Sequence, residues 1–173
     1  MRALTQGFWH FACDLYQRDS AEHAFLWLQD NASLDVTSLL LCCWLATHYG
    51  ERAEQHIESL LADASLWSQQ LVRPLRRARY WYRNLPEAQQ DPEFYRQLKD
   101  VELAGEKALI LRLEHRAQAL FGSPGTGCAD VTLLAERLIH LYLAGANIRL
   151  SDEGHQQLAR IVTALADDPA SGC

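Results

Sequence analysis

One short stretch of the chain gathers positive charge and aromatic rings. Residues 73–83 read Arg-Pro-Leu-Arg-Arg-Ala-Arg-Tyr-Trp-Tyr-Arg, and the wider segment 64–86 contains no aspartate or glutamate. This positive segment belongs to a chain whose formal net charge is −6. Guanidinium groups bind phosphates and carboxylates through paired hydrogen bonds, and aromatic rings stack on nucleic-acid bases or on other guanidinium groups. The segment therefore has the chemistry to bind an anionic partner.

The spacing within this segment predicts a helix with two different faces. At about 100° per residue, the apolar residues fall together on a predicted core face. They are Leu71, Leu75, Ala78, Tyr82 and Leu85. The arginines fall on the opposite face or at its edge. The candidate residues for binding a partner are Arg73, Arg76, Arg77, Arg79, Tyr80 and Arg83. This face predicts a non-enzymatic interaction or regulatory protein that docks an anionic protein segment or a nucleic acid.

Two other interpretations of the arginines remain open at this stage. Acidic residues from other helices can meet them inside the molecule, and the candidates are Asp30, Asp35, Glu102 and Glu106. Glu102 and Glu106 are four residues apart, so they share one face of a helix. In the first interpretation, these pairs only stabilise the fold. In the second, the four acids line a polar pocket facing the arginines, and the protein binds a small ligand or is an enzyme.

The other reactive residue types form no recognisable catalytic or metal motif. The five cysteines include no Cys-x-x-Cys, and the seven histidines include no His-x-x-x-His. Because Cys42 and Cys43 fall in an apolar segment, we expect them to pack as core residues. The glycine-rich stretch 122–128 lacks the Lys-Ser/Thr of a phosphate-binding loop and is interpreted as a connector. The sequence thus predicts no catalytic residue, no metal and no cofactor.

Apolar residues recur at helical spacing along nearly the whole chain, and no segment alternates like a strand. We therefore predict an all-α, single-domain bundle of seven to eight helices. The segment Val36–Tyr49 is apolar on all sides, which predicts a buried helix at the centre of the bundle. The predicted organisation is a main helical bundle (1–121), a Gly/Pro loop (122–130), a C-terminal helical hairpin docked on the bundle (131–167) and a disordered tail (168–173).

Several helix boundaries can be predicted from capping and breaking residues. The predicted N-terminal caps are Ser20, Asp35, Asp130 and Ser151. Gly50 is predicted to end the central helix. Asp91-Pro92-Glu93 combines a cap, a first-turn proline and an acidic first turn, and predicts the start of a helix of about 30 residues. Before it, two separate helices are predicted over 52–64 and 66–85, with a kink or a new start at Pro74.

The bulk composition limits the class of protein. With 49% hydrophobic and 22% charged residues, the chain resembles ordinary globular proteins. The longest uncharged apolar run, Val36–Thr47, is shorter than the roughly 20 residues that span a membrane. The N-terminus lacks a secretory pattern and the cysteines favour a reducing compartment, so we expect a cytoplasmic protein that does not bind membranes. A homodimer through the long helix is a further expectation. Its apolar residues there are Leu103, Ile110, Leu113 and Ala117.

The N-terminal two thirds of the chain carry a set of short motifs in a characteristic order. They are Phe8-Trp9-x-Phe11, Leu15-Tyr16, Leu28-Gln29-Asp30, Asp35-Val36, Leu40-Leu41-Cys42-Cys43-Trp44-Leu45-Ala46, Trp67, Val72-x-Pro74-Leu75-Arg76-x-x-Arg79 and Glu102-Leu103-Ala104-x-Glu106. Over residues 7–112 the chain resembles an uncharacterised family of small proteobacterial proteins, known only as a domain of unknown function. The resemblance implies a bacterial cytosolic protein and supplies no activity, cofactor or catalytic residue. Gly105 departs from the family pattern, and it weakens a helix by about 1 kcal/mol relative to alanine.

Overall fold

The computed structural model describes residues 7–18, 20–125 and 130–166, and every regular element in these ranges is helical. The α-helices are α1 (Phe8–Tyr16), α2 (Ala21–Ala32), α3 (Val36–Tyr49), α4 (Ile57–Trp67), α5 (Arg73–Arg83), α6 (Pro92–Phe121), α7 (Val131–Gly145) and α8 (Asp152–Ala166). The predicted all-α class is confirmed. None of the described helices has both the length and the apolar character needed to cross a membrane. The predicted tail, 168–173, lies outside the described residues.

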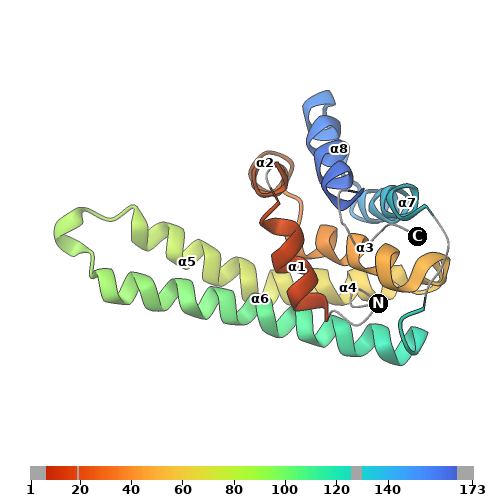
Figure 1. Ribbon diagram of the computed structural model, residues 1–173. Helices are drawn as coiled ribbons and strands as arrows, with labels where there is room; N and C mark the ends of the chain where they lie inside the picture. The colour runs from red at the N-terminus through yellow and green to blue at the C-terminus, as the bar shows by residue number, and fades with distance from the viewer. Residues whose placement is uncertain (1–6, 19, 126–129, 167–173) are drawn as a thin grey trace.

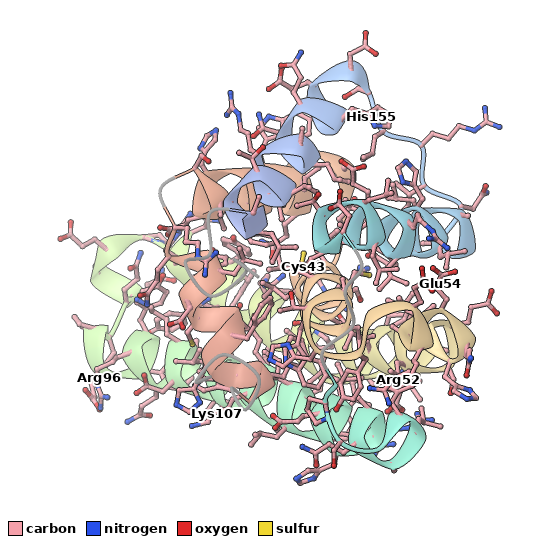
Figure 2. All side chains as sticks on the ribbon, turned by 45° about the vertical axis from the view of Figure 1, so that its right-hand side comes forward. Cys43, Arg52, Glu54, Arg96, Lys107 and His155 are labelled. Atoms are coloured by element: carbon pink, nitrogen blue, oxygen red, sulfur yellow. The ribbon has the colours of Figure 1, made fainter. Side chains whose placement is uncertain are left out.

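Helix α3 forms the centre of the bundle. Every residue from Thr37 to Ala46 is buried, and α1, α2, α4, α6 and α7 pack around it (Figure 1). Figure 2 shows Cys43 enclosed by helices in the middle of the molecule, whereas Arg96 extends into solvent at its edge. The helix ends where Gly50 adopts a φ of 58°, a conformation that glycine reaches without steric cost. The predicted bounds and central place of this helix are therefore confirmed.

The most extended feature is a helical hairpin. Helix α4, a π-helical turn (Ser68–Val72) and α5 follow one another without a break, and they run antiparallel along α6. Helix α6 has the predicted length, 30 residues. The turn between α5 and α6 reaches away from the other helices (Figure 1). This hairpin carries the arginine segment, so part of that segment stands clear of the bundle.

The path of the arginine segment corrects two predictions. The sequence predicted separate helices and an interruption at Pro74, but the wider turn directly before Pro74 absorbs the missing N–H and lets the helix continue. The extra residue in this turn rotates α5 by about 100° relative to α4. The predicted core face is only partly correct, since Leu71 and Ala78 are exposed and only Tyr82 is buried. The reason is that α5 packs mainly on α6 and protrudes from the other helices.

Helices α7 and α8 form a hairpin that packs on the rest of the bundle. Helix α7 lies against α3, and α8 lies against α2 (Figure 1). Apolar residues of both helices, including Leu138 and Ile161, belong to the same buried core as α3. Near the start of α3, the backbone N–H of Asp35 donates a hydrogen bond to the hydroxyl of Tyr142 at 2.9 Å. The described part of the chain therefore has one shared core.

Three of the four predicted N-terminal caps are present. The side chains of Asp35, Asp130 and Ser151 accept hydrogen bonds from backbone N–H groups in the first turns of α3, α7 and α8. Ser20 precedes α2, but its side chain makes no capping hydrogen bond, so that prediction is wrong. Asp91 accepts a bond of 2.9 Å from a backbone N–H in the first turn of α6, as its sequence predicted. Local polar residues thus set most of the helix starts.

Candidate functional site

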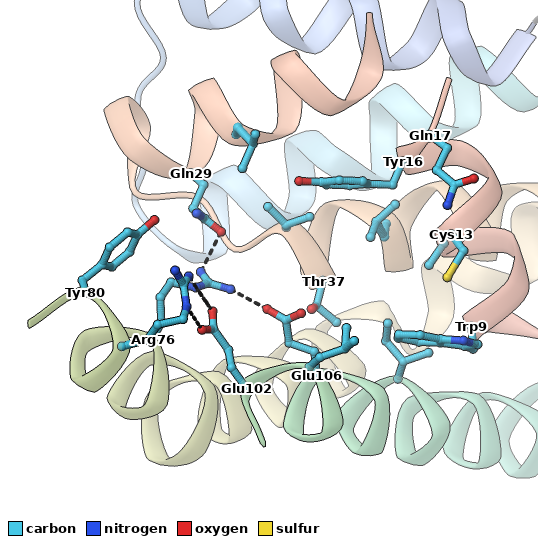
Figure 3. A pocket seen from close by; sticks show the side chains of 17 residues that line it. Trp9, Cys13, Tyr16, Gln17, Gln29, Thr37, Arg76, Tyr80, Glu102 and Glu106 are labelled. Atoms are coloured by element: carbon cyan, nitrogen blue, oxygen red, sulfur yellow. Dashed lines mark hydrogen bonds and ion pairs between the residues drawn. The ribbon is translucent and has the colours of Figure 1, made fainter. Parts of the chain in front are cut away.

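Two glutamates of α6 hold two arginines of α5. Nε of Arg76 donates a hydrogen bond to Glu102 at 2.9 Å, and Nη2 donates to Glu106 at 2.6 Å. Arg79 donates to both carboxylate oxygens of Glu102. Nη1 of Arg76 also reaches α2, where it donates to the side-chain oxygen of Gln29 at 2.6 Å (Figure 3). We call Arg76 and Arg79 the inner arginine pair, because this network ties α5 to α6 and to α2.

The charges in this network are unequally compensated. Burial alone would raise the pKa of Glu102, but hydrogen bonds from Arg79 and Arg76 outweigh it, and the pKa is lowered. The hydrogen bond to Glu102 correspondingly raises the pKa of Arg79. For Glu106, burial is the largest influence and the pKa is raised, although Arg76 pulls it down. Glu102 is therefore a well-paired carboxylate, and Glu106 is a less fully compensated one.

Two of the four acids predicted for a polar pocket form no ion pair with the described arginines. The side chain of Asp35 accepts hydrogen bonds from the backbone N–H of Ser38 and the hydroxyl of Ser68, so it joins the start of α3 to the π-helical turn. Asp30 is near the end of α2, where it accepts a bond of 3.4 Å from Gln29. The structure thus brings Glu102 and Glu106 to the arginines and uses Asp35 for capping.

A cavity of about 340 Å³ begins at this network and continues between α1, α2, α3, α5 and α6. Its polar end contains Arg76, Glu102 and Glu106, and Figure 3 shows Trp9 and Cys13 at the other end. Its lining is Trp9, Ala12, Cys13, Tyr16, Gln17, Leu26, Gln29, Val36, Thr37, Leu40, Arg76, Arg79, Tyr80, Glu102, Leu103, Glu106 and Ile110. Sequence reasoning missed the α1 contribution, because nothing in the sequence indicates which helix crosses the arginine segment.

A second hollow lies on the solvent side of α5. It has a volume of about 430 Å³ and is lined by Gln69, Arg73, Arg76, Arg77 and Tyr80. Arg73 and Arg77 are exposed, and neither forms an ion pair with the residues that the structure describes. We call Arg73, Arg77, Gln69 and Tyr80 the outer arginine surface. Arg76 and Tyr80 line both this hollow and the cavity.

Aromatic rings accompany the arginines at the far end of α5. The guanidinium carbons of Arg79 and Arg83 lie 4.6 and 5.4 Å from the centre of the Tyr80 ring. Across the hairpin, a hydrogen bond with Arg79 lowers the pKa of Tyr95, and Arg83 adds to this effect. Arg83 itself is exposed. Tyr80 is therefore held in place by cation–π contacts.

The adjacent cysteines behave as core residues. Cys42 and Cys43 are free thiols with no exposed surface, and burial raises the pKa of Cys43 to about 12. A thiol in that state supplies no thiolate nucleophile. Cys13 differs, since it is a free, partly exposed thiol that lines the cavity. Cys128 lies outside the described residues. Within the described ranges, no three His, Cys, Asp or Glu side chains gather as metal ligands.

The predicted dimer surface on α6 is mostly internal. Ile110, Leu113 and Ala117 are at most 4% exposed, because this half of α6 faces α1, α3 and α4. Leu103 is 52% exposed, since it lies closer to the protruding end of the hairpin. Three of the four residues proposed for self-association are therefore core residues of the same chain, and that assignment is wrong.

Residues 7–113 match a family described as protein of unknown function, DUF2390. The chain belongs to this family. The match confirms the resemblance to a domain of unknown function and covers nearly the same residues. Every lining residue of the cavity and of the outer hollow falls inside the DUF2390 segment, whereas α7 and α8 lie beyond it. No curated protein and no solved structure matches the chain.

Proposed function

We propose that this DUF2390 protein is a non-enzymatic docking protein whose outer arginine surface binds an acidic segment of a protein partner. One observation carries the proposal. Arg73 and Arg77 are exposed beside a hollow and form no ion pair with a described acid, while the inner arginine pair is held by Glu102 and Glu106. The outer guanidinium groups therefore keep hydrogen-bond donors for an external carboxylate.

The charge distribution of the chain supports selective binding. The segment 64–86 contains no acidic residue, although the formal net charge of the whole chain is −6. A local positive surface on a negative molecule attracts an acidic segment to one place and repels it elsewhere. The phenol ring of Tyr80, fixed between Arg79 and Arg83, adds an apolar contact beside the hollow.

A protein partner fits this surface better than a nucleic acid does. Non-specific binding to nucleic acids relies on many phosphate contacts, about 6–10 in typical cases. Here Arg73, Arg77 and Arg83 are the exposed arginines of α5, and the remainder of the chain is acidic. A short acidic segment needs only a few such contacts. RNA binding is therefore the alternative outcome of the test.

We also propose a bacterial cytoplasmic setting for this docking function. The buried thiols Cys42 and Cys43 are free, and the chain uses neither in a disulfide. Free thiols are typical of proteins in reducing compartments. The resemblance of residues 7–112 to a family of bacterial proteins also supports a cytoplasmic setting. A partner for the outer arginine surface would then be a cytoplasmic protein with an exposed acidic segment.

Fluorescence anisotropy with a fluorescein-labelled oligo-glutamate peptide tests the proposal. The wild-type protein is expected to bind the peptide, and Arg77→Glu is expected to weaken binding by about tenfold, since each hydrogen bond to a charged group contributes about 1.5–3 kcal/mol. Arg77 is exposed and has no ion-pair partner among the described residues, so the variant is expected to fold. Arg76 is unsuitable for this test, because its reversal would break the inner network.

Arg149→Glu is the matched control, because it makes the same charge change at an exposed position between α7 and α8. It is expected to bind the peptide nearly as well as the wild type. Equal weakening by both variants, or no peptide binding at all, contradicts the proposal. A labelled single-stranded RNA of equal net charge is titrated in parallel. If the RNA binds more tightly and Arg77→Glu abolishes that binding, the partner is RNA and the protein-docking proposal fails.

A further inference from the structure

We propose that the cavity between α1, α2, α3, α5 and α6 binds a small amphipathic amine, with its ammonium group at Glu106 and its apolar part between Trp9 and Ile110. This site shares only Tyr80 with the outer arginine surface, and the proposal does not depend on docking there. The cavity volume of about 340 Å³ lies within the range of about 300–1,000 Å³ that is typical of small-molecule sites.

Most of the cavity wall suits an apolar ligand body. Trp9 comes from α1, Leu40 from α3, and Leu103 and Ile110 from α6, so three helices contribute apolar surface. Leu103 is 52% exposed. An apolar group that enters the cavity removes this surface from water, and such burial is favourable at about 25 cal/mol per Å². The apolar wall therefore contributes to affinity but does not discriminate between charged and neutral head groups.

Three oxygen atoms at the polar side of the cavity receive no hydrogen bond from the residues that the structure describes. Glu106 receives the Arg76 hydrogen bond on Oε1, and no described residue donates to its Oε2. The hydroxyl groups of Tyr16 and Thr37 likewise form no hydrogen bond with a described residue. Thr37 and Glu106 both line the cavity, and in Figure 3 the Tyr16 hydroxyl points toward the Arg76 end. These oxygens keep some accessible surface, so each can accept a hydrogen bond from a ligand in the cavity. An ammonium group has three N–H donors, which matches three acceptor oxygens.

The charge at this end selects a cation over an anion. Glu102 is paired with both inner arginines, whereas Glu106 shares only Arg76. Burial raises the pKa of Glu106 in spite of Arg76, and the nearby charge of Asp35 adds to this effect. The carboxylate therefore lacks full compensation. A ligand ammonium supplies the missing positive charge, and a ligand carboxylate would increase the repulsion.

Calorimetric titration with tryptamine is the first test. Tryptophol has the same indole body with a neutral hydroxyl, and indole-3-acetate has a carboxylate. We expect tryptamine to bind about tenfold more tightly than tryptophol, since a charge-assisted hydrogen bond contributes about 1.5–3 kcal/mol. Indole-3-acetate is expected to bind most weakly. Equal affinities, a preference for indole-3-acetate, or no binding of tryptamine would overturn the proposal.

Glu106→Gln tests the position of the ammonium group. The substitution keeps the shape of the side chain and removes its charge, so tryptamine affinity should fall about tenfold while tryptophol affinity stays unchanged. Glu93→Gln removes a charge at the exposed start of the same helix, where Glu93 pairs with Arg96, and should leave both affinities as in the wild type. If Glu106→Gln binds tryptamine as tightly as the wild type does, the proposed head-group site is wrong.

A measurement on the unaltered chain removes any dependence on how the variants fold. Cys13 lines the cavity as a free thiol, whereas Cys42 and Cys43 are fully buried. Saturating tryptamine should slow the alkylation of Cys13 by N-ethylmaleimide several-fold, as followed by peptide mass spectrometry. Tryptophol at the same concentration should protect Cys13 less. If calorimetry detects tryptamine binding and Cys13 is not protected, the amine binds elsewhere and the proposal is contradicted.

Discussion

In α3 every residue from Thr37 to Ala46 is buried, whereas in α5 only Tyr82 is. The tryptophans show the same contrast, since Trp44 is 1% exposed and Trp81 is 67% exposed. Helix α3 is surrounded by α1, α2, α4, α6 and α7, and α5 packs mainly on α6. Apolar burial therefore stabilises the centre, while paired charges hold much of the hairpin. Arg73 and Arg77, which form no ion pair with a described residue, are the charges of the hairpin that remain available to a partner.

The largest expected effect is at the centre of the bundle. Trp44→Ala should lower the free energy of unfolding by about 3–5 kcal/mol, because it removes a stacked ring and leaves a cavity beside Phe8. Trp81→Ala should change it by less than about 0.5 kcal/mol, because the exposed ring loses little packing. Urea unfolding followed by circular dichroism measures both. Similar losses in the two variants would show that the far hairpin is as stabilising as the centre.

A smaller loss of stability is expected when the inner arginine pair loses Glu102, the carboxylate that both arginines share. Glu102→Ala leaves Arg76 and Arg79 without their common carboxylate in a partly buried place, and we expect a cost of about 3 kcal/mol. Glu93→Ala removes a carboxylate from a fully exposed pair with Arg96, and stability should hardly change. The same urea series compares the two. A tolerated Glu102→Ala would mean that the hairpin is held by packing alone.

The two glutamates should contribute to the pH dependence of stability with opposite signs. The pKa of Glu102 is lowered in the folded state, so its contribution is present above the unfolded value of about 4.3 and is lost as the pH falls through the folded pKa. The pKa of Glu106 is raised, so its contribution is present at acidic pH and is lost as the pH rises through the folded pKa.

The difference in unfolding free energy between wild type and Glu102→Gln should therefore shrink as the pH is lowered. For Glu106→Gln the wild type should instead gain relative to the variant over the same acidic range. Urea unfolding at a series of pH values gives both curves. If the two variants show the same trend with pH, the opposite directions of the two pKa shifts are contradicted.

The smallest expected effect is a gain in stability when Gly105 is replaced. This buried glycine of α6 faces Leu71 and Leu75, and a methyl group there would lie 3.5 Å from the nearest atom, which is ordinary contact. Gly105→Ala should therefore raise stability by up to about 1 kcal/mol through helix propensity. Thermal unfolding monitored by circular dichroism measures this gain. A clear loss would mean that α5 and α6 approach too closely to accept a side chain.

Much of the fold could be predicted because its signals are local. The apolar run of α3, the caps Asp35 and Asp130, and the start of α6 at Asp91 each depend on a few neighbouring residues. The path through Pro74 could not be predicted, since a π-helical turn replaces the expected interruption and rotates the following residues.

The candidate site was only half predictable for a different reason. The sequence suggested that Glu102 and Glu106 meet arginines, and the structure shows which ones, namely Arg76 and Arg79. Which side of α5 faces the bundle depends on the π-helical turn and on packing between distant helices. Asp35 carried two signals, a helix cap and a pocket acid, and the local role of capping is the one it fills.

Comparing Arg79→Ala with Arg77→Ala in urea unfolding tests most directly whether the arginines of α5 divide into an inner and an outer set. Arg79 lies two residues from Arg77 but binds both oxygens of Glu102. We expect Arg79→Ala to lower the free energy of unfolding by about 3 kcal/mol, whereas Arg77→Ala should stay within about 0.5 kcal/mol of the wild type. Equal losses, or a larger loss for Arg77→Ala, would contradict the division and remove the basis for a free arginine surface.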